Sequence, residues 1–351
     1  MDRNPPPANP DLGGIDAPRT PELDTLRLVP DSSGLNQAAS LLQAGRLVAF
    51  PTETVYGLGA DATNPQAIAA LYAAKGRPQF NPLIAHVAHL DQARAEGLLN
   101  ESAEKLAAHF WPGPLTLVVP RNPAGSVCDL ACAGLASIGL RFPSHPIARA
   151  LLEKAGRPIA APSANRSGHV SPTTPDHVWD DLNRRIDAVV EGYASPVGVE
   201  STIIACLDDT PRLLRHGGIT REMVEACLGT TLVEGIPTHR GKTDSSQPIA
   251  PGMLESHYAP SVPVRLQAET VGADEAILLF GNTRPHGMTG ESISLNLSPR
   301  GDLTEAAANL YAFLRRLDSS RVSGIAVVPI PEQGLGAAIN DRLQRAAAPR
   351  S

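Results

Sequence analysis

GRLVAFPTETVYGLGADATNPQAIAALYAAKGRPQFNPLIAHV, residues 45–87, contains the signals from which the fold can be predicted. An apolar run at 47–50 has the length of a strand and stops at Pro51, where the glycine-punctuated loop PTETVYGLG follows. Asn64 and Pro65 fit the N-cap and first turn of a helix, and Gly76 fits the residue just past its end. A second apolar run at 83–87 completes a predicted strand–helix–strand unit.

This unit gathers polar side chains at the ends of its predicted elements. They come from the loop, the helix exit and the second strand: Thr52, Thr54, Tyr56, Lys75, Arg77, Asn81 and His86. A buried strand that runs into a polar loop is where α/β proteins place ligands. We therefore expect a binding site here.

The same alternation continues along the chain. Helices are predicted at 33–42, 101–110, 146–152 and 175–182, and strands at 115–119, 137–140 and 158–161. Short strands alternating with helices indicate an α/β or α+β layer with a sizeable sheet.

At 351 residues the chain is long for one domain, so two domains are expected. Residues 1–28 are proline-rich and are predicted to be a disordered extension. A first domain is expected at 29–230, a linker or lid at 231–260, and a second domain at 261–351. The strand and helix pattern of the second domain predicts a small Rossmann-like sheet.

Charge and composition favour a small-molecule enzyme. The net charge is −6, and residues 31–229 contain 16 Lys and Arg against 19 Asp and Glu, whereas a nucleic-acid binder is expected to show a positive face. No apolar run approaches the ~20 residues of a membrane span, and no signal peptide is recognisable, so a cytoplasmic protein without membrane contact is expected.

The motifs of P-loop NTPases, protein kinases, zinc peptidases and α/β-hydrolases do not occur in the sequence. What remains is a set of hydroxyls, amides and cations after predicted strands: Thr54, Lys75, Arg77, Asn81, Arg141, Ser163, Asn165, Ser171, Ser201 and Arg215. This set offers donors to phosphate and carboxylate oxygens and few general bases. It suits transfer chemistry that depends on positioning and charge stabilisation.

Seven further blocks follow PTETVYGLG in order along the chain. They are AKGRPQFNPL, WPGPLTLVV (111–119), GLRFPSHP (139–146), APSANRSGHVSPTT (161–174), VGVESTI (197–203), LLRHGGIT (213–220) and SHYAP (256–260). Together they resemble the YrdC-like threonylcarbamoyl-AMP synthases, and SHYAP with the domain after it resembles the long, two-domain branch. The resemblance implies an α/β domain with a large twisted mixed sheet, plus a smaller C-terminal Rossmann-like domain.

The resemblance also implies an activity. L-threonine, bicarbonate and ATP would give L-threonylcarbamoyl-AMP and pyrophosphate, for the threonylcarbamoyladenosine modification of tRNA. The downstream tRNA threonylcarbamoyl-transferase machinery would receive the product. Mg²⁺ is expected with ATP, although no set of protein ligands for a metal stands out, because Mg²⁺ is often held chiefly by phosphates and water.

Site residues are carried over from the family onto matching positions. The catalytic pair would be Lys75 and Arg77; the ATP site would comprise Arg77, Asn81, Ser137, Ser163, Asn165, Ser171, Arg215 and Tyr258; and the threonine site would comprise Thr54, His86, Arg141, Ala161 and Ser201. Plainer interpretations stay open. Lys75 and Arg77 could simply favour the dipole of a helix end, His86 could be a core histidine, and Tyr258 could be a packed aromatic.

Two other functions compete with the synthase. The first is a double-stranded RNA or tRNA-binding YrdC-like module without synthase activity, which the balance of 16 to 19 charges disfavours. The second is a carbamoyl-transferring maturation domain of related fold, which is normally embedded among zinc-finger modules. This chain lacks the Cys-x-x-Cys pairs that those modules need.

Overall fold

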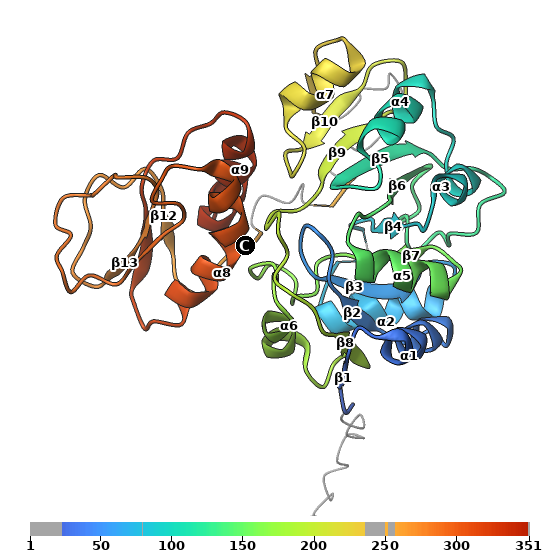
Figure 1. The fold of residues 1–351 in the computed structure, drawn as a ribbon, viewed down its shortest axis with the longest axis horizontal. Coiled ribbons are helices and arrows are strands. Elements are labelled where there is room, and N and C mark those ends of the chain that lie inside the picture. The colour runs from blue at the N-terminus through green and yellow to red at the C-terminus, as the bar shows by residue number, and fades with distance from the viewer. Residues whose placement is uncertain (1–22, 79, 236–249, 252–256, 350–351) are drawn as a thin grey trace, which may run out of the picture.

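The computed structural model describes residues 23–78, 80–235, 250–251 and 257–349, which form two α/β units (Figure 1). The first is built on an 11-stranded mixed sheet. Its strands lie in the order β1 (Leu26–Leu28), β8 (Ala188–Val190), β2 (Val48–Phe50), β3 (Gly57–Asp61), β7 (Ile159–Ala160), β4 (Ile84–His86), β6 (Ser137–Arg141), β5 (Leu115–Pro120), β9 (Thr202–Ala205), β10 (Arg212–Arg215) and β11 (Val233–Glu234). The predicted large mixed sheet is confirmed.

Alternation along the strands divides the core between the two faces of this sheet. Val48 and Phe50 pack on one face with leucines of α1 (Ser32–Gln43) and α5 (Pro146–Ala155). Ala49 points to the other face and joins the core cluster of α2 (Pro65–Lys75), α4 (Glu101–Phe110), α6 (Pro175–Leu182) and α7 (Arg221–Leu228). Side chains of period two therefore bury both faces.

Helices α1 and α5 cover only part of their face. Farther along the same sheet, Ile84, Val118 and Ile203 form a small apolar cluster with Ala250, and none of the described members of this cluster belongs to a helix. Loops and a segment after the first unit cover this part of the face instead. It is the part of the fold that holds the candidate site.

Residues 45–87 fold largely as their helix-capping residues predict. The Asn64 side chain accepts hydrogen bonds from the amides of Gln66 and Ala67, which satisfies donors at the start of α2. The helix ends at Gly76, whose φ of 61° is left-handed and suits glycine. This helix end fixes the positions of Lys75 and Arg77.

The stretch also contains a strand that the prediction missed. Residues 57–61, whose first three were expected to belong to a loop, form β3 antiparallel to β2. The two glycines of GLGAD read as loop residues, but one of them is required by packing. A Cβ at Gly59 would lie 2.9 Å from the ring of Phe50 on the neighbouring strand.

The N-terminal boundary also differs from the prediction. The extension was expected to reach residue 28, but Leu26–Leu28 form β1, which pairs in parallel with β8. This pairing partner lies some 160 residues downstream, and three residues carry too little periodicity to announce an edge strand. The rest of the extension, 1–22, lies outside the described residues, as does most of the expected linker or lid at 231–260.

The second unit has the predicted parallel sheet. Its strand order is β12 (Val264–Arg265), β15 (Gly324–Val327), β13 (Glu275–Leu279) and β14 (Ser294–Asn296), with all pairs parallel. Helices α8 (Leu303–Asp318) and α9 (Leu335–Ala347) lie between this sheet and the first unit (Figure 1). None of the described helices has the length and apolarity needed to cross a membrane.

The two units share a buried contact. Val55, Val170 and Val199 of the first unit belong to the same core cluster as Tyr258 and the apolar residues of α8 and α9. Gly198 lies at the closest approach, because a Cβ there would be 2.2 Å from the carbonyl oxygen of Ala307. Its φ of 74° is also left-handed.

Alanine at Gly198 tests how tightly the units pack. Gly229, at the end of α7, has φ 73° but no atom within 4 Å of the position that a Cβ would occupy, so Gly229→Ala should cost only the left-handed penalty of ~1–2 kcal/mol. Gly198→Ala should cost a further ~1–3 kcal/mol from steric overlap. Urea unfolding of both variants measures the difference, and equal losses would contradict a tight contact.

Candidate functional site

A cavity of about 50 Å³ lies over the sheet face that α1 and α5 leave uncovered. Nine of the residues predicted for the site line it: Thr54, Arg77, His86, Arg141, Ala161, Ser163, Ser201, Arg215 and Tyr258. The remaining lining residues are Val55, Ile84, Pro162, Glu200, Pro251 and His257. Residues from positions 54 to 258 therefore meet in one place.

Strand register explains why these residues meet. Ile84 and His86 are two apart on β4 and so share a face, and His86 pairs with Arg141 on the parallel strand β6. Strand β7 runs antiparallel to β4, so the end of β7 lies beside the start of β4. There the Ala161 amide donates to the Ile84 carbonyl at 3.1 Å. The site thus extends over the sheet face as well as along the loops after strands.

Arg77 is a buried cation without a carboxylate partner among the described residues. Its Nη2 donates to the carbonyls of Asn81 at 3.5 Å and Pro82 at 3.2 Å, and its Nε has no partner. Burial lowers the pKa of Arg77 to about 10, so it is still protonated at neutral pH. An anion in the cavity would supply the missing negative charge.

Arg215 is also a buried cation without a carboxylate partner among the described residues. It donates from Nε and Nη2 to the Ser201 carbonyl, at 3.1 and 3.0 Å, and from Nη1 to the Pro251 carbonyl at 3.3 Å. Burial lowers its pKa as well, and none of its hydrogen-bond acceptors is charged. Two buried guanidinium groups on one cavity make it a strong anion site.

Lys75 lies behind the cavity rather than on it. Its ammonium donates to the carbonyls of Ser163 and Asn165, in the loop after β7. Burial and the nearby charge of Arg77 lower the pKa of Lys75 well below its ordinary value. These contacts make Lys75 a brace for the loop that carries Ser163.

Arg141 already has a carboxylate beside it. Its Nη2 donates to Glu53 Oε1 at 2.7 Å, and both side chains are buried. Glu53 Oε2 and Arg141 Nε have no partner, so each group keeps unused hydrogen-bonding capacity. Glu53 was not among the predicted site residues, although its place in the PTETVYGLG motif was a signal for it.

The two histidines on the cavity are neutral at physiological pH. Burial, with a smaller contribution from Arg141, lowers the pKa of His86 to about 3. Burial and Arg77 lower the pKa of His257 to about 3. Both imidazoles can therefore donate or accept hydrogen bonds without adding charge.

Hydroxyl pairs complete the wall. Thr54 Oγ1 lies 2.8 Å from Thr52 Oγ1, and Ser201 Oγ lies 2.7 Å from Thr116 Oγ1. Both pairs are buried. Each fixes the hydroxyl of a cavity residue with a neighbour behind it.

Five predicted residues do not line the cavity. They are Lys75, Asn81, Ser137, Asn165 and Ser171. Asn81 and Asn165 are buried nearby, and each has a side-chain oxygen without a partner. Ser137 starts β6, four residues and ~13 Å from Arg141 at its end.

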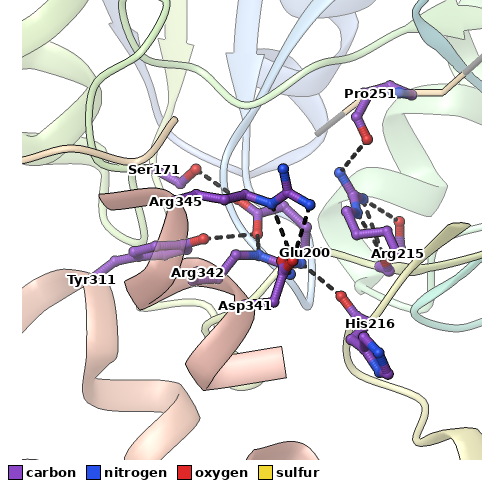
Figure 2. A network of polar contacts seen from close by, with 10 residues as sticks. Ser171, Glu200, Arg215, His216, Pro251, Tyr311, Asp341, Arg342 and Arg345 are labelled. Carbon is purple, nitrogen blue, oxygen red and sulfur yellow. Dashed lines mark hydrogen bonds and ion pairs between the residues drawn. The ribbon is translucent and has the colours of Figure 1, made fainter. Parts of the chain in front are cut away.

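Ser171 belongs to a buried network centred on Glu200 (Figure 2). Glu200 Oε1 accepts from Ser171 Oγ at 2.6 Å, while Oε2 accepts from Tyr311 and from Arg342, both at 2.8 Å. Burial opposes ionisation, but Arg342, Arg215 and the Ser171 hydrogen bond together lower the pKa of Glu200 to about 2. Tyr311 and Arg342 were not predicted, because each reads as an ordinary residue of an amphipathic helix.

The described residues do not include a group of three or more His, Cys, Asp or Glu side chains arranged to hold a metal ion. The four cysteines are free thiols. The buried guanidinium groups of Arg77 and Arg215 fit an anionic ligand.

Comparison with known proteins agrees with this geometry. The family model described as "Telomere recombination" (Sua5, YciO and YrdC) matches residues 40–217, and that of the "Threonylcarbamoyl-AMP synthase, C-terminal domain" matches 219–348. Threonylcarbamoyl-AMP synthase of Bacillus subtilis is 42% identical over 327 residues, covering 90% of this chain and 93% of its own, and that of Pyrococcus abyssi is 40% identical over 320 residues, covering 88% and 92%.

A solved structure extends the likeness to the whole fold. The crystal structure of P. abyssi Sua5 complexed with L-threonine superposes with a TM-score of 0.81 at 35% identity, covering 92% of this chain and 97% of that one. A match of this extent includes most of both units. With matches to both family-model domains and to full-length relatives, the chain belongs to the threonylcarbamoyl-AMP synthases, a family of nucleotidyl-transferring enzymes that act in tRNA modification.

Proposed function

We propose that this protein converts L-threonine, bicarbonate and ATP into L-threonylcarbamoyl-AMP and pyrophosphate in the cavity on the first sheet. The observation that carries the proposal is the pair of buried guanidinium groups, Arg77 and Arg215, which have only neutral acceptors. Leaving a charge buried and unpaired is costly, so a bound polyanion would repay that cost.

ATP would lie with its phosphates against these two arginines. A guanidinium can hold two phosphate oxygens at once, and the negative charge that builds up during transfer would be stabilised in place. Ser163 would contact the nucleotide from the loop that Lys75 braces, and Asn81, Asn165 and Ser171 would support it from behind. Ser137, at the start of β6, does not line the cavity and stays a predicted ATP contact.

Threonine would bind at the other end of the cavity. Arg141 would hold its carboxylate and would be kept in place by Glu53, while Thr54 and Ser201 would contact its amine or hydroxyl. Ala161 would contribute an apolar contact. His86 beside Arg141 stays neutral, because its pKa is lowered to about 3, so it would serve the bound threonine as a hydrogen-bond partner and not as a base.

The chemistry follows from these positions. The threonine nitrogen attacks the carbon of bicarbonate, which forms a carbamate and releases water. If bicarbonate first loses water to give carbon dioxide, the same attack forms the carbamate and releases a proton. A carbamate oxygen then attacks the α-phosphorus, and the bond to the bridging oxygen breaks to release pyrophosphate. Proximity would supply much of the rate, because both attacking groups are weak nucleophiles that need alignment.

The walls of the cavity have to move for this to happen. A volume of about 50 Å³ is far below the ~300–1,000 Å³ of common ligand sites. His257 and Tyr258 line it from the segment 231–260 that was expected to be a linker or lid. We propose that they close over the bound nucleotide, which keeps water from the activated product.

We also propose the metal, the compartment and the partner of the reaction. Mg²⁺ would be held by ATP phosphates and water rather than by a carboxylate cluster. The product would pass in the cytoplasm to the machinery that transfers threonylcarbamoyl groups to tRNA, and the chain itself would not hold nucleic acid stably. The family membership supports the synthase over the RNA-binding alternative.

The reaction itself is the first test. Purified protein given ATP, threonine and bicarbonate should release pyrophosphate and form an AMP-linked product with the mass of threonylcarbamoyl-AMP. Omitting threonine or bicarbonate should abolish both signals. Formation of ADP and phosphate instead would contradict transfer at the α-phosphorus.

Arg77→Ala should lower turnover by ~10² or more, because a donor that stabilises charge at a reacting phosphoryl group is worth several kcal/mol. Arg157→Ala is a matched control. Arg157 also follows the left-handed glycine at a helix end, but it pairs with Asp61 away from the cavity. Similar kinetics for the two variants, measured well below their unfolding temperatures, would reduce Arg77 to a helix-end charge.

Substrate analogues test the threonine end. Serine lacks one methyl group and should bind more weakly by ~1 kcal/mol. Threoninol lacks the carboxylate and should bind far more weakly, because Arg141 would stay buried with unused donors. Competition assays against labelled threonine give both affinities, and equal inhibition by the two analogues would argue against the assignment of Arg141.

A further inference from the structure

The second unit contributes none of the described residues that line the cavity. Residues from 261 onward nevertheless contact three of them: the Arg345 carbonyl accepts from the His257 amide at 3.3 Å, and side chains contact Glu200 and Tyr258. The side-chain contacts come from one residue on α8 and one on α9, which face the first unit (Figures 1 and 2). These contacts connect the second unit to the site from behind.

Arg342 joins two separate segments of the first unit. Its Nε donates to Glu200 Oε2 at 2.8 Å, and its Nη2 donates to the His216 carbonyl at 2.8 Å. Glu200 directly precedes Ser201, and His216 directly follows Arg215. One guanidinium thus spans the two places where the chain delivers a threonine-site residue and an ATP-site residue to the cavity.

Arg342 is itself held in a fixed orientation. Its side chain is fully buried, and its third nitrogen donates to Asp341 Oδ2 at 2.5 Å. Asp341 in turn accepts from Arg345 Nε at 3.1 Å. A planar guanidinium with three different acceptors has a single orientation, which an ammonium group could not reproduce.

Tyr311 and Arg342 also fix Tyr258. The Tyr311 hydroxyl donates to Glu200 at 2.8 Å, and its ring stacks on Tyr258 with centroids 5.7 Å apart. The Arg342 guanidinium lies 5.4 Å from the centre of the Tyr258 ring. Tyr258 has φ 62°, an unfavourable value for tyrosine, so its conformation depends on such contacts.

We propose that Arg342 is a positioning residue, through which the second unit sets the geometry of Ser201, Arg215 and Tyr258 for binding threonine and ATP. The inference rests on the proposed function. On this basis the second unit is needed for substrate affinity even though it does not touch the substrates. Tyr311 contributes to the same positioning through its contacts with Glu200 and Tyr258.

The test uses the full chain and the conservative variant Arg342→Lys. The lysine ammonium keeps the positive charge near Glu200 but cannot donate to Glu200 and to the His216 carbonyl together. We expect the KM values for threonine and ATP each to rise by ~10-fold or more. Arg316→Lys, an exposed arginine on α8, is the matched control and should leave both KM values unchanged.

A merely structural role predicts a different pattern. It would lower the fraction of active enzyme, and hence the apparent kcat, without changing either KM. Tyr311→Phe removes one hydroxyl and should raise both KM values by a smaller factor. Thermal unfolding of each variant identifies loss of folding. If Arg342→Lys does not fold, the double variant Arg342→Met with Glu200→Gln removes both charges together. Calorimetry should still show weakened threonine binding by this double variant.

The outcomes separate the two proposals. A wild-type protein that makes threonylcarbamoyl-AMP, with a folded Arg342→Lys or double variant of unchanged affinity for threonine and ATP, would overturn the role of Arg342 alone. A wild-type protein that makes no such product would overturn the proposed function.

Discussion

The structure depends on keeping arginine side chains buried and charged beside one cavity. Each guanidinium removed from water needs acceptors, because an unpaired buried charge is far more costly than a buried apolar group. Glu53 supplies an acceptor to Arg141, and Glu200 supplies one to Arg342. Arg77 and Arg215 have only neutral acceptors among the described residues, so the fold leaves positive charge where a nucleotide would bring negative charge.

The mixed sheet makes this arrangement possible. Backbone carbonyls of Pro82, Ser163 and Ser201 can point at cations because the loops that carry them run across an uncovered part of the sheet face. The parallel pair β4 and β6 places His86 beside Arg141, and the antiparallel β7 reverses the chain over the same face. A sheet with a helix over this region would have no space for the cavity.

The second unit gives the buried charges a further role. Glu200 is ionised because Arg342 lies beside it, and Arg342 belongs to a helix that begins more than 130 residues later. Pairing of this kind is weak evidence for stability, since an apolar replacement can be as stable, but it specifies geometry well. Here that geometry concerns the segments that carry Ser201 and Arg215, beside the contact where the two units share one core cluster.

Local signals in the sequence determined much of this protein. Asn64 and Gly76 set the ends of α2, apolar runs located strands β2, β4, β5, β6 and β7, and the motif residues included nine that line the cavity. Those features depend on neighbours along the chain. Strand β3 was hidden by its two glycines, one of which, Gly59, is required by the close approach of the Phe50 ring. The Lys75 ammonium lies behind the cavity because carbonyls of a distant loop accept its hydrogen bonds. The contacts of Tyr311 and Arg342 with Glu200 were decided by tertiary structure alone, because a polar side chain on an amphipathic helix looks the same in sequence whether it meets water or a buried carboxylate.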